Sequence, residues 1–405
     1  MTKPKLLFLS QTLPYPPDSG AKARTYQVLR QLAIQFEITA LCFYRRAEFA
    51  VDQEVEKAVA GLSDVATVEV FPIPQEQSRS RWFKDHLVSL IGRRVYTVGV
   101  FDSARFGKRL AGALRSRAFD LAYADSLDLS RWFDRLGEVP LVCNHHDAQS
   151  VLLARRAALE PNPIHRWYLH HQSELMAREE RTWCGRVALN AVVSEVDRSH
   201  LIRQAPGAAV IVVPNGVDLA YYRPSSGEES GVLFVGASTW APNRDAMNYF
   251  AEAILPELRH RQPGVAVRWV GRISSDDAVA LKPHRIESAG HVPDTRPWLA
   301  AAACCIAPIR IGGGTRIKIL EAWAMGKAVV STSIGCEGLA ARDDDNLLIR
   351  DEPASFAEAI DQVLRDPALR GRLGEAGRQT VERHYGWTAI GRAMNDAYLA
   401  IARLG

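Results

Sequence analysis

Three consecutive glycines, Gly312, Gly313 and Gly314, lie between a short apolar run and a helical pattern in the second half of the chain. The apolar run ends at Pro308, and the helical pattern begins near Thr315. Bare backbone N–H groups at the start of a helix bind anions, because the helix dipole adds positive potential there. The spacing therefore predicts an anion site. It is not a Walker A motif, since no Gly-Lys-Ser/Thr sequence closes the loop.

The first turn of this predicted helix carries two cations, Arg316 and Lys318. Thr315 is a suitable N-cap, but a capping box would place a glutamate at position 318. Cations at the positive end of a helix dipole cost about 0.3 to 1 kcal/mol each unless an anion is bound there. A bound phosphate would make both cations favourable. The alternative is a flexible glycine loop with both side chains solvated.

Glu321 lies one turn further along, at the border of the apolar stripe of the same helix. A carboxylate in this position could accept hydrogen bonds from the two hydroxyls of a ribose, as acidic residues do in dinucleotide sites. The alternative is a local pair with Lys318. With the phosphate loop, Glu321 predicts a nucleotide site.

His146 follows the apolar run Leu141 to Cys143, at the carboxyl end of a predicted strand, where open α/β folds bind ligands. The alternative is a capping or packing histidine. His145, His146 and Asp147 are adjacent on one short turn and cannot easily converge on a metal, and no fourth ligand is evident. We therefore expect no required metal and no cofactor.

Short apolar runs alternate with helical patterns in both halves of the chain, which predicts an α/β fold of two doubly wound, Rossmann-like domains. The strands expected in the first half are Leu6 to Leu9, Ile38 to Phe43, Thr67 to Phe71, Leu121 to Tyr123, Leu141 to Cys143, Ala191 to Val193 and Val210 to Val213. Those expected in the second half are Val232 to Val235, Val267 to Val270, Cys304 to Pro308, Ala328 to Ser331 and Leu347 to Ile349.

Helical stretches are expected between these strands, among them Ala21 to Gln35, His165 to Trp183 and Arg244 to Arg259. The prolines, glycines and serines of Pro214 to Gly231 predict a linker. We expect domains at 1–218 and 219–386, facing each other, and a last helix at 387–405 that packs back on the first domain.

Composition favours an ordinary globular protein, since 47% of the 405 residues are hydrophobic and 24% are charged. The first ten residues lack the apolar region of a secretory signal, and no stretch approaches the ~18 apolar residues of a membrane span. We therefore expect a cytoplasmic location. The six cysteines have no metal or disulfide spacing, and we expect them to be reduced core residues.

Basic residues concentrate between Arg79 and Arg117, where ten Lys/Arg face two acids. This segment carries a net +8 within an overall +4, which leaves −4 for the rest. Its first part, Arg79 to Val95, also contains large apolar residues, a pattern typical of a segment that lies on an anionic membrane. The alternative is a solvated helix packed on its domain. No nucleic-acid motif is present, and we expect no nucleic-acid partner.

The segment GGGTRIKILEAWAMGKAVVST resembles the donor-site signature of family-four (group 1) glycosyltransferases of the GT-B fold, including those that build bacterial surface polysaccharides. Further segments that resemble the family are PPDSGAKAR (16–24), NHHDAQS (144–150), VVPNGVD (212–218), FVGASTWAPN (234–243) and GHVPD (290–294). The resemblance covers nearly the whole chain.

The resemblance implies that Glu321 binds the ribose, that the chain around Val292 edges the base, and that His146 lies near the reacting sugar. Residues implied to bind the donor are Gly20, Gly236, Val292, Gly312, Gly313, Gly314, Thr315 and Glu321. Residues implied to be catalytic are His146, Arg316 and Lys318. The first domain would then hold the acceptor and the second the donor.

The sequence departs from the family pattern at two positions. Gly313 stands where many members have the first of two glutamates that read the donor sugar. Ala237 stands where many have an arginine, which leaves four cations to neutralise the diphosphate. These cations are Arg244, Arg310, Arg316 and Lys318.

The resemblance implies a hexosyltransferase-type enzyme (EC 2.4) that moves a sugar from a nucleoside-diphosphate sugar to a glycan or lipid-linked acceptor, with retention. One alternative is a nucleotide-sugar epimerase, for which only Asp18 and Asp147 stand near Gly20 and His146. The other is a catalytically inactive binding subunit. The sequence leaves the sugar, the base and the acceptor open.

Overall fold

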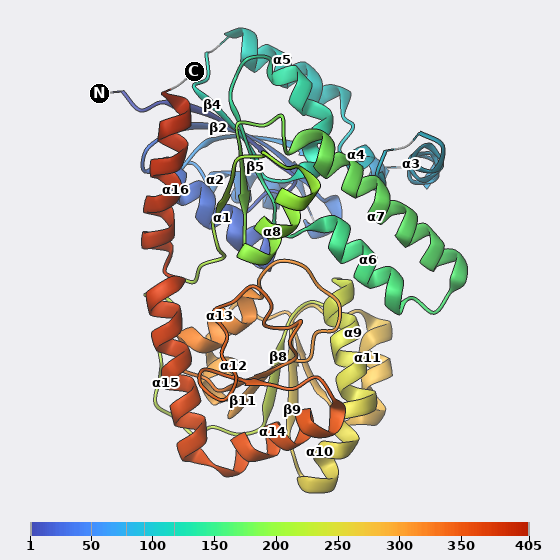
Figure 1. The fold of residues 1–405 in the computed structure, drawn as a ribbon, viewed down its shortest axis with the longest axis vertical. Helices are drawn as coiled ribbons and strands as arrows, with labels where there is room; N and C mark the ends of the chain where they lie inside the picture. The colour runs from blue at the N-terminus through green and yellow to red at the C-terminus, as the bar shows by residue number, and fades with distance from the viewer. Residues whose placement is uncertain (1, 50, 78, 93, 117, 404–405) are drawn as a thin grey trace. The chain divides into compact units, whose positions relative to one another are not determined.

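Two units of the chain are each built on one parallel sheet with helices on its faces (Figure 1). The computed structural model describes all residues except 1, 50, 78, 93, 117 and 404–405. The first unit comprises residues 1–214 and 388–405, and the second comprises residues 215–387. The α/β class with two Rossmann-like domains, expected from the sequence, is confirmed.

The sheet of the first unit has the strand order β3-β2-β1-β4-β5-β6-β7. Its strands are β1 (Lys5–Ser10), β2 (Glu37–Tyr44), β3 (Thr67–Pro72), β4 (Leu121–Ala124), β5 (Leu141–Asn144), β6 (Leu189–Val192) and β7 (Val210–Val212). Its α-helices are α1 (Gly20–Ala33), α2 (Asp52–Ala60), α3 (Arg79–Gly92), α4 (Tyr96–Val100), α5 (Ala104–Ser116), α6 (Gln149–Leu159), α7 (Pro163–Trp183), α8 (Glu195–Gln204) and α16 (Trp387–Ala402). Short 3-10 helices span Arg46–Glu48, Pro74–Gln77 and Leu127–Leu136.

The sheet of the second unit has the order β10-β9-β8-β11-β12-β13. Its strands are β8 (Val232–Val235), β9 (Val267–Val270), β10 (Glu287–Gly290), β11 (Cys304–Ala307), β12 (Val329–Ser331) and β13 (Leu348–Ile349). Its α-helices are α9 (Ala241–Tyr249), α10 (Leu255–Arg261), α11 (Ser275–Leu281), α12 (Arg296–Ala301), α13 (Ile317–Ala324), α14 (Pro353–Arg365) and α15 (Pro367–His384), with a 3-10 helix at Lys282–His284.

Each sheet has one point at which the order of its strands reverses. In the first sheet this point lies between β1 and β4, and in the second it lies between β8 and β11. Crossover connections leave such a point in opposite directions, which opens a crevice at the carboxyl ends of the two strands. The residues that follow these four strands are therefore placed to meet a ligand.

The strands occur where the apolar runs predict them, because strands buried on both faces are nearly continuous in apolar residues. The sequence missed β10, which is a polar edge strand. The helix expected from Arg244 to about Arg259 is present, but it is not one continuous α-helix. A π-helical turn, Phe250–Ile254, separates α9 from α10 just before Pro256, which has no N–H to continue an α-helical ladder.

The segment expected to be a linker, Pro214 to Gly231, is instead tied to the second unit. Glu229 forms ion pairs with Lys327 at 2.5 Å and with Arg370 at 2.9 Å. Earlier in the same segment, Tyr222 makes a side-chain hydrogen bond to α13. Turn residues mark this segment as irregular in sequence, but its side chains fix it in place.

Helix α16 packs on the first unit, although the elements that it contacts there lie far from it in the sequence. Asn395 Nδ2 donates to the carbonyl of Gln31 at 2.8 Å, and the ring of Tyr398 lies 6.1 Å from that of Tyr123. The helix thus contacts α1 and β4.

All six cysteines are buried free thiols, as expected. Burial raises the pKa of Cys305 to about 12 and that of Cys336 to about 11, which keeps both as thiols near neutral pH. In the part of the chain that the structure describes, no helix is long and apolar enough to span a bilayer.

Helix α15 provides a test of the packing of the second unit. A Cβ atom added at Gly374 would lie 2.1 Å from the carbonyl oxygen of Gly326, whereas one at Gly371 would meet nothing within 4 Å. We expect Gly374→Ala to destabilise the second unit by about 1 to 3 kcal/mol and Gly371→Ala to stabilise it by about 0.5 to 1 kcal/mol. Urea midpoints measure both, and equal shifts would contradict this packing.

Candidate nucleotide-sugar site

The glycine loop leaves β11 at the point where the second sheet reverses, and it leads into α13. The helix begins at Ile317, so Arg316 occupies the N-cap position, without a side-chain cap. The predicted capping role of Thr315 is wrong. Its hydroxyl instead accepts a hydrogen bond from Asn215 Nδ2 at 2.8 Å, and the same amide also reaches the Thr315 carbonyl at 3.2 Å.

The guanidinium of Arg316 lies against the glycine loop. It donates to the carbonyls of Gly313 and, at 2.8 Å, Gly314, and Gly314 has φ +64°. A Cβ atom at Gly312 would lie 1.9 Å from Arg316 Nη2. A side chain at Gly312 would therefore displace the arginine from this position, and Gly314 is favoured by its backbone conformation. Arg316 brings its charge to the loop and also holds the shape of the loop.

Lys318 is held in a desolvated position in the first turn of α13. Its Nζ donates to Asn243 Oδ1 at 2.8 Å and lies 3.8 Å from the ring centre of Phe234. Burial lowers the pKa of Lys318 well below its ordinary value, and the nearby charge of Arg316 lowers it further. An anion bound beside this ammonium would counter both effects.

Asn243 connects the loop after β8 to Lys318, a role that the sequence did not reveal. Its amide nitrogen donates to the Ala237 carbonyl at 3.0 Å, while its oxygen accepts from Lys318. A Cβ atom at Gly236 would lie 2.7 Å from the same amide nitrogen. Gly236 therefore lets Asn243 approach. The two loops at the reversal point meet through this side chain.

Glu321 faces Tyr222, whose hydroxyl donates to Glu321 Oε1 at 2.9 Å. Burial raises the pKa of Glu321 to about 7, although the tyrosine hydrogen bond and Lys318 act in the opposite direction. Tyr222 belongs to the segment that the sequence marks as a linker, so sequence reasoning missed this partner. Val292, which follows β10, packs at the margin of the apolar core of this unit.

Two of the four cations considered for neutralising the diphosphate form ion pairs with acidic residues. Arg310 pairs with Asp245 at 2.6 Å and stacks on Tyr249, and Arg244 pairs with Asp277 at 3.3 Å. Arg316 and Lys318 contact neutral carbonyl and amide oxygens instead. These two residues lie beside the glycine loop at the start of α13, which makes them the better candidates to meet an anion.

In the first unit, His146 lies in the loop that follows β5, and Gly20 begins the helix that is reached by the loop after β1. The His146 side chain is 16% exposed, and its Nε2 lies 3.4 Å from Asp125 Oδ1. Gly20 is the first residue of α1, after the N-cap Ser19. Asp18, a candidate acid of the epimerase alternative, pairs with Lys22 at 3.2 Å.

His145 has a structural role. It is buried, and its Nε2 lies 3.1 Å from Asn190 Oδ1. Burial lowers its pKa, so the ring is neutral near pH 7. Within the described ranges, no three His, Cys, Asp or Glu side chains gather in an arrangement that could hold a metal ion.

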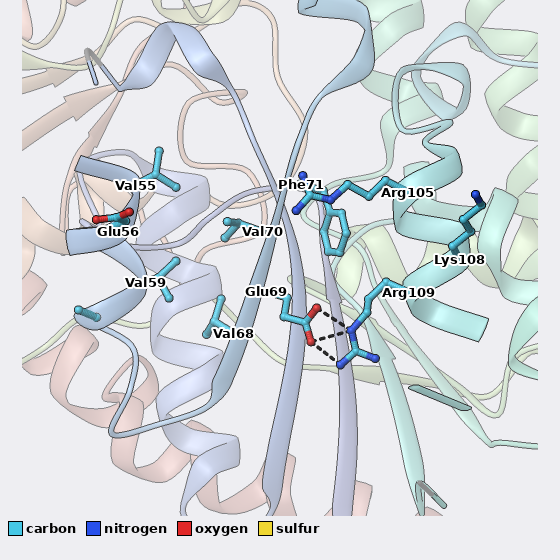
Figure 2. A pocket seen from close by; sticks show the side chains of 11 residues that line it. Val55, Glu56, Val59, Val68, Glu69, Val70, Phe71, Arg105, Lys108 and Arg109 are labelled. Carbon is cyan, nitrogen blue, oxygen red and sulfur yellow. Dashed lines mark hydrogen bonds and ion pairs between the residues drawn. The ribbon is translucent and has the colours of Figure 1, made fainter. Parts of the chain in front are cut away.

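An open cavity of about 790 Å³ lies over β3, at the edge of the first sheet (Figure 2). Figure 2 shows Val55 and Val59 of α2 on one side and Arg105, Lys108 and Arg109 of α5 on the other, with Glu69 bonded to Arg109. None of the predicted site residues lines this cavity.

Comparison with known proteins places this arrangement in a class. Residues 229–366 match the family model described as glycosyl transferases group 1. Over its whole length the chain resembles the solved HepE of Anabaena in complex with UDP and glucose, with a TM-score of 0.69, 17% identity, and 98% of this chain and 99% of that chain covered. It also resembles a sucrose-phosphate synthase from Thermosynechococcus elongatus, with a TM-score of 0.71, 14% identity, and 99% and 100% of the chains covered.

Among curated proteins, the lipopolysaccharide core biosynthesis glycosyltransferase LpsE of Rhizobium meliloti is 37% identical over 119 residues, 29% of this chain and 34% of the relative. The mannosyltransferase LpcC of Rhizobium leguminosarum bv. viciae is 24% identical over 234 residues, 52% of this chain and 64% of the relative. The chain thus spans between about a third and two thirds of these relatives. The resemblance to family-four glycosyltransferases of the GT-B fold, seen in the sequence, is confirmed.

The pKa of Glu321 predicts a pH effect on stability. A carboxyl group whose pKa is higher in the folded protein than its unfolded value of 4.5 stabilises the fold when it is protonated. This contribution is present in full below pH 4.5 and is lost as the pH rises through about 7. Compared with that of Glu321→Gln, the free energy of unfolding of wild type should fall by about 2 to 3 kcal/mol between pH 5 and pH 8. Urea unfolding measures this. The exposed Glu287→Gln variant, the control, should run parallel to wild type.

Proposed function

We propose that this protein is a glycosyltransferase that moves a sugar from a nucleoside-diphosphate sugar to a glycan or lipid-linked acceptor. The observation that carries the proposal is the glycine loop at the reversal point of the second sheet, with two cations, Arg316 and Lys318, beside it at the start of α13. Such a loop suits a diphosphate. The relatives that act in lipopolysaccharide core biosynthesis support a surface glycan as the product.

In this proposal the second unit binds the donor and stabilises the leaving group. Negative charge grows on the β-phosphate as the glycosidic bond to it breaks, and fixed donors nearby stabilise that charge. The amides of Gly312 to Thr315, with Arg316 and Lys318, would supply these donors. Glu321 would accept hydrogen bonds from the ribose, and Val292 would edge the base. No metal would be required, because the two cations stand where one would act.

In the first unit, Gly20 and His146 would contact the transferred sugar or its phosphates. Retention of configuration would need no protein nucleophile, since a leaving phosphate oxygen can assist deprotonation of the acceptor. His146 would then orient a hydroxyl of the substrate. The protein would work in the cytoplasm.

Donor binding is testable by thermal stabilisation with UDP-, GDP- and ADP-sugars, with and without magnesium. A ligand at 100 times its dissociation constant stabilises the native state by about 2.7 kcal/mol. We expect one diphosphate sugar to raise the melting temperature of wild type, with or without magnesium, and to have little effect on Glu321→Ala.

The control for this assay is Lys282→Ala, which removes an exposed cation from the same unit. It should bind the donor as wild type does. Stabilisation of Glu321→Ala equal to that of wild type would remove this glutamate from the site. Stabilisation without any sugar transfer would favour the inactive binding subunit, and release of an epimerised nucleotide sugar without acceptor would favour the epimerase.

Transfer itself is expected to depend on Lys318. Lys318→Ala removes a charge that matters most when the leaving group is formed, so kcat should fall by about 100-fold or more while donor binding changes less. Lys282→Ala again serves as the control. A kcat unchanged in Lys318→Ala would contradict the assigned role.

We further propose that the basic segment 79–117 brings the protein to an anionic membrane surface, at the inner face. Phe83, Leu87 and Ile91 form a stripe at helical spacing along α3, and Phe83 and Ile91 are 65% and 75% exposed. Helix α3 is held by its other residues: the His86 ring lies 3.8 Å from that of Tyr96, and the buried Ser89 accepts a hydrogen bond from Gln172 Nε2 at 2.9 Å. An apolar stripe on an anchored helix suits the boundary of a bilayer.

Cations accompany this stripe. Lys84 is exposed on α3, and Arg105 and Lys108 lie beside the cavity over β3 (Figure 2). Each basic residue near an anionic leaflet contributes about 1 kcal/mol. Arg93, Arg117 and the side chain of Arg79 belong to the same segment but lie outside the described residues.

Vesicle sedimentation tests the membrane proposal. We expect wild type to bind vesicles containing phosphatidylglycerol more strongly than neutral ones, and less strongly at high salt. The double change Phe83→Ser with Ile91→Ser should weaken binding about tenfold or more, since two large apolar side chains no longer enter the boundary. Val279→Ser, at a 62% exposed valine of α11, is the matched control. If the double variant bound the anionic vesicles as strongly as Val279→Ser does, the proposal would be refuted.

A further inference from the structure

Asp125 is a buried carboxylate at the reversal point of the first sheet. It follows the last residue of β4, and its backbone N–H donates to the carbonyl of Leu9 in β1 at 2.8 Å. Its exposure is 0%. A carboxylate is costly to bury unless it is bonded, so its partners indicate why it is there.

The two oxygens of Asp125 differ in their surroundings. Oδ2 accepts hydrogen bonds from Thr25 Oγ1 at 2.9 Å and from Ser10 Oγ at 3.2 Å. Oδ1 faces Nε2 of His146 at 3.4 Å. Among the residues that the structure describes, neither Oδ1 nor this Nε2 has a hydrogen-bond partner. The carboxylate is thus fixed through one oxygen and directs the other at the histidine.

The two facing atoms, Asp125 Oδ1 and His146 Nε2, suit each other as hydrogen-bond acceptor and donor. A carboxylate oxygen only accepts, so the nitrogen that faces it must carry the proton. The separation is longer than a usual N–H···O bond of about 2.9 Å, and such bonds in ligand-free sites are often long and tighten when substrate binds.

We propose that Asp125 is a positioning residue that holds His146 as the Nε2–H tautomer. Nδ1 then carries a lone pair and accepts a hydrogen bond from a substrate hydroxyl. The identity of that hydroxyl, on the transferred sugar or on the acceptor, rests on the proposed function, but the tautomer does not. A histidine in the opposite tautomer would donate from Nδ1 and could not accept the hydroxyl hydrogen.

Other charged groups near this pair define the controls. Asp128, in the 3-10 helix after β4, is buried and interacts electrostatically with His146, and burial raises its pKa. Arg24 of α1 is electrostatically coupled to Asp125 and bonds to Asn144 at 2.9 Å. His145, the chain neighbour, is neutral near pH 7 because burial lowers its pKa. Of these groups, Asp128 is the matched buried carboxylate.

The tautomer can be read directly from nitrogen NMR of the full chain labelled with ¹⁵N-histidine, with the His146 ring assigned by its loss in His146→Gln. We expect wild type to show the Nε2–H form near pH 8 and Asp125→Asn to shift toward Nδ1–H, because an amide can donate to Nε2. Asp128→Asn should leave the tautomer unchanged. An Nδ1–H ring in wild type overturns the proposal whether or not the protein transfers sugar and whether or not Asp125→Asn folds.

A double-mutant cycle then tests the consequence for turnover. Asp125→Asn should lower kcat by about 100-fold in wild type, with little change in the donor KM, and by less than about twofold in the His146→Gln background. Melting temperatures of all four proteins report folding. The same loss in both backgrounds would mean that Asp125 acts on the fold and not through His146, and would overturn the proposal.

Discussion

Right-handed crossovers on both faces force the strand order of a doubly wound sheet to reverse at one point, and the candidate site of the second unit and the Asp125 carboxylate of the first lie at these points. In the second unit, the loops after β8 and β11 meet through Asn243. In the first unit, β1 and β4 bring Ser10 and Asp125 together. The rest of each sheet is a frame of buried strands and covering helices that fixes these loop ends.

Desolvation governs the proposed donor site. Lys318 is surrounded by a neutral amide and an aromatic ring, and burial lowers its pKa, while burial raises that of Glu321. Both groups therefore carry their charges at a cost in the ligand-free protein. A ligand that places negative charge beside the lysine and hydroxyl donors beside the glutamate would relieve both costs at once. A nucleotide sugar would supply both, and water would supply no negative charge.

The sequence predicted what depends on local pattern. Apolar runs located the strands to within one or two residues, and the glycine triplet with its two cations located the loop. It could not predict contacts made by side chains far apart in the chain. Tyr222 bonds to Glu321 across 99 positions, and Asn215 takes the hydroxyl of Thr315 that capping rules assign to α13. The pair of Asp125 and His146 was missed for the same reason, although an acid at the end of a strand was visible.

The packing of α16 has a consequence for biosynthesis. Asn395 bonds to Gln31 across 364 positions, so the helix that completes the first unit is made after all of the second unit. During translation the first sheet emerges early but leaves α1 and Tyr123 without their cover. These contacts cannot form until α16 has been made. The second unit, which is continuous in the chain, can fold meanwhile, so the order of folding should be the reverse of the order of synthesis.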